Sequence, residues 1–150
     1  MSPLGKPSSL IKPTKDTKFH IDYEWWERSG QDLRIYLLSH LPPEVRERLS
    51  QSEHDAVVDY IDPDTAEVMK LDALGLAIQQ AAKAPDFINE HTSLVDSVFR
   101  VFLANGNTPL SSRELAEVTG RSADTILKTL GGHRVYKGIR PYIPPQDDKK

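Results

Sequence analysis

The chain has 150 residues, of which 38% are hydrophobic and 27% charged, enough for one ordinary domain or two very small ones. It contains no cysteine, which excludes disulfides, thiolate nucleophiles, zinc–thiolate sites and iron–sulfur clusters. No apolar run approaches the roughly 20 residues of a membrane span, and the first residues lack the apolar core of a secretory signal. We therefore expect a cytoplasmic protein with no membrane partner.

The net charge of −3 is unevenly distributed along the chain. Residues 22–72 carry thirteen acids and five bases, whereas residues 97–140 carry seven bases and three acids. An acidic chain argues against a general nucleic-acid coat protein. If the protein binds a polyanion, the C-terminal third is the expected contact region.

Residues 1–17 are predicted to form a disordered basic arm, because they contain three prolines, three serines and few bulky apolar residues. The lysines in and next to this arm admit two interpretations. They act as a solubilising tail, or they add non-specific phosphate contacts whose strength depends on salt. These lysines are Lys6, Lys12, Lys15 and Lys18.

Residues 18–90 are predicted to form a small α+β unit with a short β-sheet. Alternating apolar and polar residues, or short β-branched runs, indicate strands at 19–23, 56–61 and 67–71. The last two enclose an Asp- and Pro-containing turn and should form a hairpin. This acidic turn lacks the glycine and the closing glutamate of an EF-hand calcium loop, so a plain turn is the preferred interpretation.

The same unit contains the expected helices. Leucines on one face predict a helix over residues 31–41, and Pro42 ends it. Pro43 then has the position to open a further short helix. Asp72 is an N-cap for a helix that continues through Ala82.

Trp25 and Trp26 are the most conspicuous apolar pair in this unit. Their acidic neighbours argue against stacking on nucleic-acid bases. We interpret them as core residues or as candidate interface residues for self-association. A small-molecule effector pocket is the alternative.

From residue 92 onward the pattern indicates three capped helices. Ser93 begins a helix with a thick apolar stripe, and Asn105-Gly106 ends it. Ser111 and Glu114 have the spacing of a capping box that opens a second helix, which Gly120 closes. Ser122 caps a third helix over residues 123–130, and a basic extended segment over residues 133–140 follows it.

The stretch 110–130, with Glu-Leu-Ala, then a glycine, then a serine-initiated helix, resembles the helix-turn-helix of bacterial transcription regulators. Together with its flanking elements, the resemblance covers residues 92–142 and implies a winged helix-turn-helix. It implies that the helix over residues 122–130 enters the major groove of DNA. The sequence departs from the pattern at Pro141, because residues 142–145 do not resemble a returning strand. We therefore expect a rudimentary wing, followed by a tail over residues 143–150.

The third helix is predicted to have two faces. Ala123, Ile126, Leu127 and Leu130 fall on the inner face, and Asp124 is spaced to pair with Lys128 on the outer one. Groups able to reach phosphates or base edges surround that outer face. The candidate DNA-binding residues are Ser111, Arg113, Arg121, Ser122, Thr125, Lys128, Thr129, Arg134, Lys137 and Arg140.

These patterns favour a non-enzymatic DNA-binding protein, a transcriptional regulator of duplex DNA. The N-terminal unit would provide homodimerisation or docking of a protein partner. The alternative is an adaptor whose winged helix docks a protein or RNA in a larger assembly. We expect no cofactor and no metal, because the histidines are scattered and no catalytic or phosphate-binding motif is present.

Overall fold

The computed structural model describes residues 12–50, 58–61, 66 and 68–144. This part of the chain contains seven helices and two small antiparallel sheets, which confirms the α+β class. The helices are α1 (Tyr23–Ser29), α2 (Leu33–Leu38), α3 (Pro43–Ser50), α4 (Ala73–Ala82), α5 (Leu94–Ala104), α6 (Ser112–Thr119) and α7 (Ala123–Leu130). The strands are β1 (Lys18–Ile21), β2 (Val58–Ile61), β3 (Val68–Leu71), β4 (Leu110–Ser111) and β5 (Ile139–Pro141).

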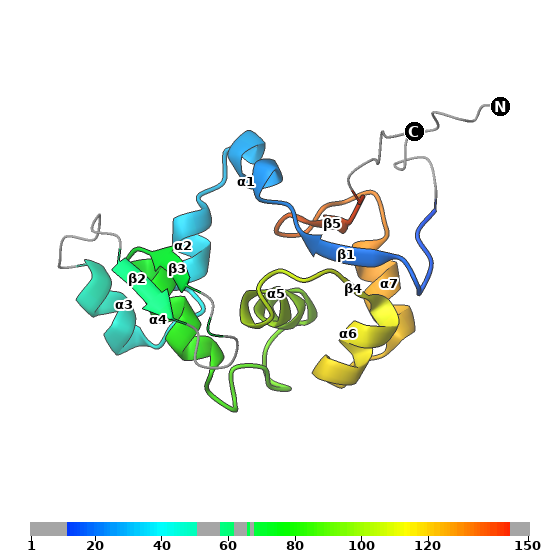
Figure 1. Ribbon diagram of the computed structural model, residues 1–150. Coiled ribbons are helices and arrows are strands. Elements are labelled where there is room, and N and C mark those ends of the chain that lie inside the picture. Colours follow the sequence, from blue (N-terminus) through cyan, green and yellow to red (C-terminus); the bar gives the residue numbers. More distant parts are fainter. Residues whose placement is uncertain (1–11, 51–57, 62–65, 67, 145–150) are drawn as a thin grey trace.

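Helix α5 lies at the centre of the molecule (Figure 1). On one side of it are α2, α3, α4 and the β2–β3 hairpin, and on the other side are α6 and α7 with the three-stranded sheet. The apolar stripe of α5 explains this position, since Val98, Phe99 and Phe102 are completely buried.

The helix starts follow the predicted caps. The Ser93, Ser111 and Ser122 hydroxyls each accept a hydrogen bond from the backbone N–H three residues later. Glu114 completes the capping box by accepting the Ser111 N–H at 2.8 Å. Asp72 caps α4 in the same way. These local signals fix where the four helices begin.

The three-stranded sheet has the order β4–β1–β5, with β1 antiparallel to both neighbours. Phe19 lies opposite Leu110 on one side and Pro141 on the other. The expectation that the first strand belongs with the other strands of residues 18–90 is therefore wrong. Phe19 and Ile21 are almost completely buried, so pairing with β4 and β5 places their side chains in the main core.

Asn107 extends the pairing of β1 beyond the end of β4. Its side-chain amide donates to the Ile21 carbonyl at 2.9 Å and accepts the Ile21 N–H at 2.8 Å. Asn107 itself has a positive φ of 63°, a conformation that asparagine tolerates better than most residues. A single side chain thus satisfies both backbone groups of a buried strand residue.

The β2–β3 hairpin is confirmed, with Ile61 opposite Val68 and Asp59 opposite Lys70. The turn that joins the strands, residues 62–65 and 67, lies outside the described residues. A separate small core packs α3 against α4 near this hairpin through Leu41, Leu49, Leu74, Ala77 and Ile78.

Helix α1 was not predicted, and it places Trp26 in the main core. The Trp26 side chain is 3% exposed and stacks on Tyr36 with ring centroids 5.4 Å apart. The interpretation as a core residue is therefore confirmed for Trp26, and its alternative assignment as an interface residue is wrong for the single chain. Trp25 is only half-buried and stays a candidate for an interface.

Candidate nucleic-acid interface

Helices α6 and α7 present the candidate interface. Gly120 ends α6 with a positive φ of 76°, which glycine adopts without strain, and Ser122 then starts α7. Leu115 of α6 and Ile126 and Leu130 of α7 are buried. These contacts hold α7 at the surface through its inner face, as predicted from its apolar spacing.

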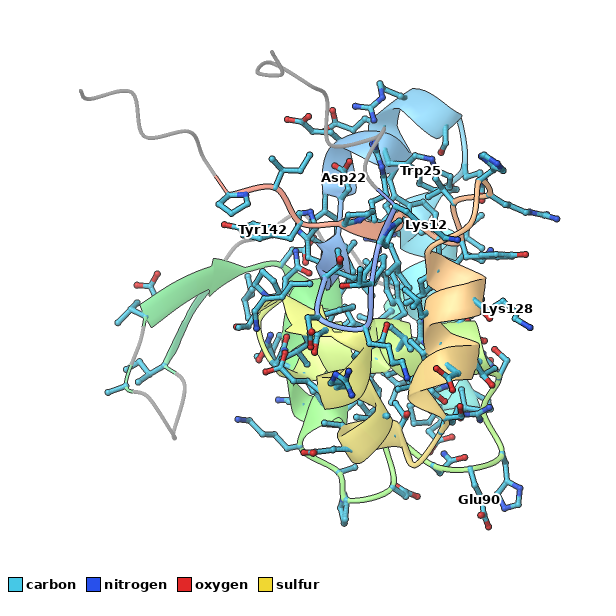
Figure 2. All side chains as sticks on the ribbon, turned by 90° about the vertical axis from the view of Figure 1, so that its right-hand side faces the viewer. Lys12, Asp22, Trp25, Glu90, Lys128 and Tyr142 are labelled. Atoms are coloured by element: carbon cyan, nitrogen blue, oxygen red, sulfur yellow. The ribbon has the colours of Figure 1, made fainter. Side chains whose placement is uncertain are left out.

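The outer face of α7 carries the exposed side chains of Thr125 and Lys128. Figure 2 shows Lys128 projecting away from the body of the protein. Thr129, which was predicted on the same face, is half-buried. A cation and a hydroxyl are thus free to contact a partner, and the threonine at 129 is less accessible.

The carboxylate of Asp124 forms its ion pair with Lys15, not with Lys128. The Lys15 Nζ lies 2.8 Å from Asp124 Oδ1. The hydrogen bond from Lys15 is the largest cause that lowers the pKa of Asp124, followed by the positive charge of Lys15. The predicted pairing with Lys128 is therefore replaced by a long-range contact, and the Lys128 ammonium group stays exposed.

The described part of the basic arm, residues 12–17, is ordered against α6 and α7, contrary to the prediction of disorder. Asp16 pairs with Arg113 at 3.0 Å, and the Arg113 N–H donates to the Lys15 carbonyl at 3.4 Å. Figure 2 shows Lys12 on this segment, which runs beside α7. Residues 1–11 lie outside the described residues.

Two of the predicted contact residues are helix caps with different accessibility. Ser111 is 6% exposed and its hydroxyl accepts from the Glu114 N–H, so it is not free to bind a partner, and its assignment as a DNA contact is wrong. Ser122 is exposed, and its hydroxyl accepts the Thr125 N–H at 3.2 Å.

Two arginines near α6 and α7 also have partners within the chain. The Arg121 guanidinium donates to the Thr92 carbonyl, which anchors the turn before α7 to the start of α5. Arg113 remains exposed, and its pair with Asp16 is an exposed ion pair of small stabilising effect. Arg121 therefore has a structural contact, whereas Arg113 is available for exchange with another anion.

The basic segment after α7 lies mostly against the N-terminal half. Arg140 pairs with Asp22 at 3.0 Å, and the Lys137 Nζ lies 4.6 Å from the centre of the Tyr36 ring. Both cations are half-buried. Arg134 is exposed, with its guanidinium over Tyr136. The prediction that all three line a partner together is wrong for Lys137 and Arg140, because α1 and α2 hold them.

No two-stranded hairpin follows α7 within residues 131–144. The described residues there contain one strand, β5, whose partner is β1, and a tight bridge from Tyr136 to Ile139. The place of a returning C-terminal strand is occupied by the N-terminal β1. Of the predicted tail over residues 143–150, residues 145–150 lie outside the described residues.

Other kinds of site receive little support from the described residues. No group of three or more metal-ligating side chains occurs among them. A hollow of about 260 Å³ lies between α3 and α4, away from α7, and is lined mainly by apolar groups such as Leu76 and Ala77. Within the described part of the chain, no helix is long and apolar enough to cross a membrane.

Comparison of the chain with protein-family models, curated proteins and solved structures gave no match. Sequence reasoning identified Thr125 and Lys128 as outward-facing, and it identified the basic character of the arm. It did not identify that Lys15 and Asp16 contact α6 and α7, because no local pattern encodes a contact across about 100 residues.

Proposed function

We propose that this protein is a non-enzymatic, cytoplasmic DNA-binding protein, a transcriptional regulator that reads duplex DNA with α7. One observation carries the proposal. Helix α7 is anchored by buried Ile126 and Leu130 and presents exposed Thr125 and Lys128 on its outer face. The resemblance of residues 92–142 to a winged helix-turn-helix agrees with this arrangement.

The chemistry of this face suits the major groove. An α-helix fits the groove, a lysine can contact phosphate or guanine acceptors, and a threonine hydroxyl can contact phosphate or either base edge. Ser122 is exposed at the start of α7, where the N–H groups of a helix's first turn suit a phosphate contact. A single module of this kind buries only about 600–1,000 Å² on DNA, which favours a homodimer or a protein partner bound through the N-terminal half.

The test is fluorescence anisotropy with a random-sequence DNA duplex at about 50 and 200 mM salt. We expect weak binding that decreases with salt, and a loss of affinity of about tenfold for Lys128→Glu. Arg34→Glu is the matched control, because Arg34 is an exposed cation on α2, on the other side of α5. Equal affinity of Lys128→Glu and wild type would refute α7 as the DNA-contacting helix.

The second candidate is an adaptor that docks a protein or RNA with the same surface. The observation in its favour is that Val118 of α6 is 51% exposed, while Arg121 and Arg140 are held by contacts within the chain. An apolar side chain beside few free cations suits a protein surface better than a phosphate backbone. Absence of duplex binding at about 50 mM salt would favour this candidate.

A further inference from the structure

We propose that residues 12–18 and α7 form one phosphate-binding surface, in which the N-terminal segment takes the place of a wing hairpin. This inference rests on the proposed function and extends it to a second part of the chain.

The topology removes the loop that would form a wing. Because β1 lies between β4 and β5, no hairpin loop joins the two adjacent strands β1 and β5. The Tyr142 N–H instead donates a hydrogen bond to the Lys18 carbonyl at 2.8 Å. The rings of Tyr142 and His20 pack edge to face, with their centroids 5.1 Å apart. Two separate chain segments therefore leave this end of the sheet side by side.

The segment before β1 follows α7 along its length. Lys15 is bound to Asp124 near the start of α7 at 2.8 Å. Pro13 lies beside Gly131 just after its end, since a Cβ built on Gly131 would be 3.5 Å from that of Pro13. Asp124 and Gly131 are seven residues apart and therefore lie on one stripe of the helix. The segment is thus placed beside the exposed face, where it would meet the same phosphate backbone.

The charges on this surface favour a polyanion. Three ion pairs join residues 12–18 to α7 and to the start of α6, and their side chains are 37–80% exposed. The pairs are Lys15–Asp124, Arg113–Asp16 and Lys18–Glu114. Exposed pairs contribute little to stability, so a phosphate oxygen can replace a carboxylate oxygen at little cost.

Two further cations on this surface have no ion pair among the described residues. Lys12 and Lys128 are both exposed, and both are visible in Figure 2 on the face that carries α7. Residues 12–18 and α7 carry four bases, Lys12, Lys15, Lys18 and Lys128, against two acids, Asp16 and Asp124. The surface is therefore positive even with every carboxylate ionised.

A segment in this position has two opposite effects to be distinguished, shielding of α7 and contact with phosphate. If residues 12–17 shielded α7 from DNA, their removal would strengthen binding. Phosphate contacts by the same lysines predict the reverse. Whether removal of the segment raises or lowers the affinity for DNA therefore distinguishes shielding from phosphate contact.

The test compares duplex affinity of wild type, Lys12→Ala/Lys15→Ala and a chain lacking residues 1–17, at about 50 and 200 mM salt. We expect both variants to bind about three- to tenfold more weakly at low salt, with a shallower salt dependence. Arg34→Ala/Arg46→Ala is the matched control, since it removes two positive charges from α2 and α3. Circular dichroism checks that the variants remain folded.

A further variant separates phosphate contact from mere neutralisation of Asp124. Lys15→Ala/Asp124→Asn removes the pair at constant net charge. We expect it to bind more weakly than wild type. Wild-type affinity in either this variant or Lys12→Ala/Lys15→Ala, or tighter binding of the shortened chain, overturns the inference.

The outcomes also distinguish this inference from the proposed function. Binding that depends on Lys128 but not on Lys12 and Lys15 overturns the inference and leaves α7 as the DNA-contacting helix. Absence of duplex binding by the wild-type protein overturns both.

Discussion

The indole Nε1–H of Trp26 donates a hydrogen bond to the backbone carbonyl of Lys137, with 3.1 Å between nitrogen and oxygen. The contact joins α1 to the segment between α7 and β5. The Asp22 N–H donates to the Gly138 carbonyl at 2.8 Å beside it. These bonds hold the C-terminal basic segment against the N-terminal half and explain why Lys137 and Arg140 contact Tyr36 and Asp22.

Replacing Trp26 by phenylalanine should destabilise the protein by about 1–3 kcal/mol, because the Lys137 carbonyl would lose its donor while an apolar ring remains. Urea unfolding followed by circular dichroism measures this change. Trp25→Phe is the control, since Trp25 is only half-buried and has no such bond in the described structure. Equal losses in the two variants would contradict the importance of the hydrogen bond.

Gly138→Ala should be more destabilising than Gly120→Ala. Both glycines have a φ of 76°, so backbone strain is similar. A Cβ at Gly138 would lie 2.7 Å from Trp26 Nε1, whereas one at Gly120 would meet nothing within 4 Å. The difference in free energy of unfolding should be about 1–3 kcal/mol, the usual cost of overpacking. Similar unfolding midpoints would show that the Trp26 ring moves away freely.

His40 should make the stability depend on pH. It is 5% exposed and accepts a hydrogen bond on Nδ1 from Arg100 Nε at 3.0 Å. Burial, together with the positive charges of Arg100 and, to a smaller extent, Lys137, lowers its pKa to about 4, against the opposing effect of Asp96.

The sign of this dependence follows from the unfolded chain, in which His40 binds a proton near its ordinary pKa of 6.5. Stability is full above that pH and decreases as the pH falls toward about 4, by on the order of 2–3 kcal/mol. His40→Gln should flatten the pH profile of the unfolding free energy, and His91→Gln, at an exposed position, should not. A smaller slope will remain, because burial also lowers the pKa of His20. An unchanged profile in His40→Gln would contradict the assignment.

A fragment of residues 88–144 should fail to fold cooperatively, although it contains every element of the proposed helix-turn-helix. It lacks β1, whose Phe19 and Ile21 are almost completely buried between β4, β5 and the helices. In the full chain, Phe19→Ala should cost about 3–5 kcal/mol. Thermal unfolding by circular dichroism tests both, with residues 12–144 as the control fragment. A sharp transition in the short fragment would show that β1 is dispensable.

Much of the secondary structure was predictable because its signals are local. The capping box of Ser111 and Glu114 and the cap at Ser122 depend on residues three positions apart. Helix α1 was missed because its seven residues carry two tryptophans and no apolar periodicity. Asp22 at its N-cap and Gly30 at its C-cap were the available signals.

The candidate site was predictable in part. The spacing of Ile126 and Leu130 placed Lys128 outward, which the structure bears out. The spacing of Arg134, Lys137 and Arg140 did not reveal that Asp22 and Tyr36 hold two of them. A charge in a sequence does not indicate its partner, because an ion pair forms with whichever opposite charge the fold brings within about 4 Å.

The sequence by itself determined the helix boundaries from Ser93 onward, the hairpin at residues 58–71 and the inner face of α7. Capping and periodicity act within one or two helical turns, so these features need no distant residue. The tertiary structure alone decided that β1 lies between β4 and β5 and that Lys15 binds Asp124. A strand with exposed backbone groups can pair with any suitable edge, and burial of Phe19 and Ile21 in the main core selects the partners that lie about 90 and 120 residues away.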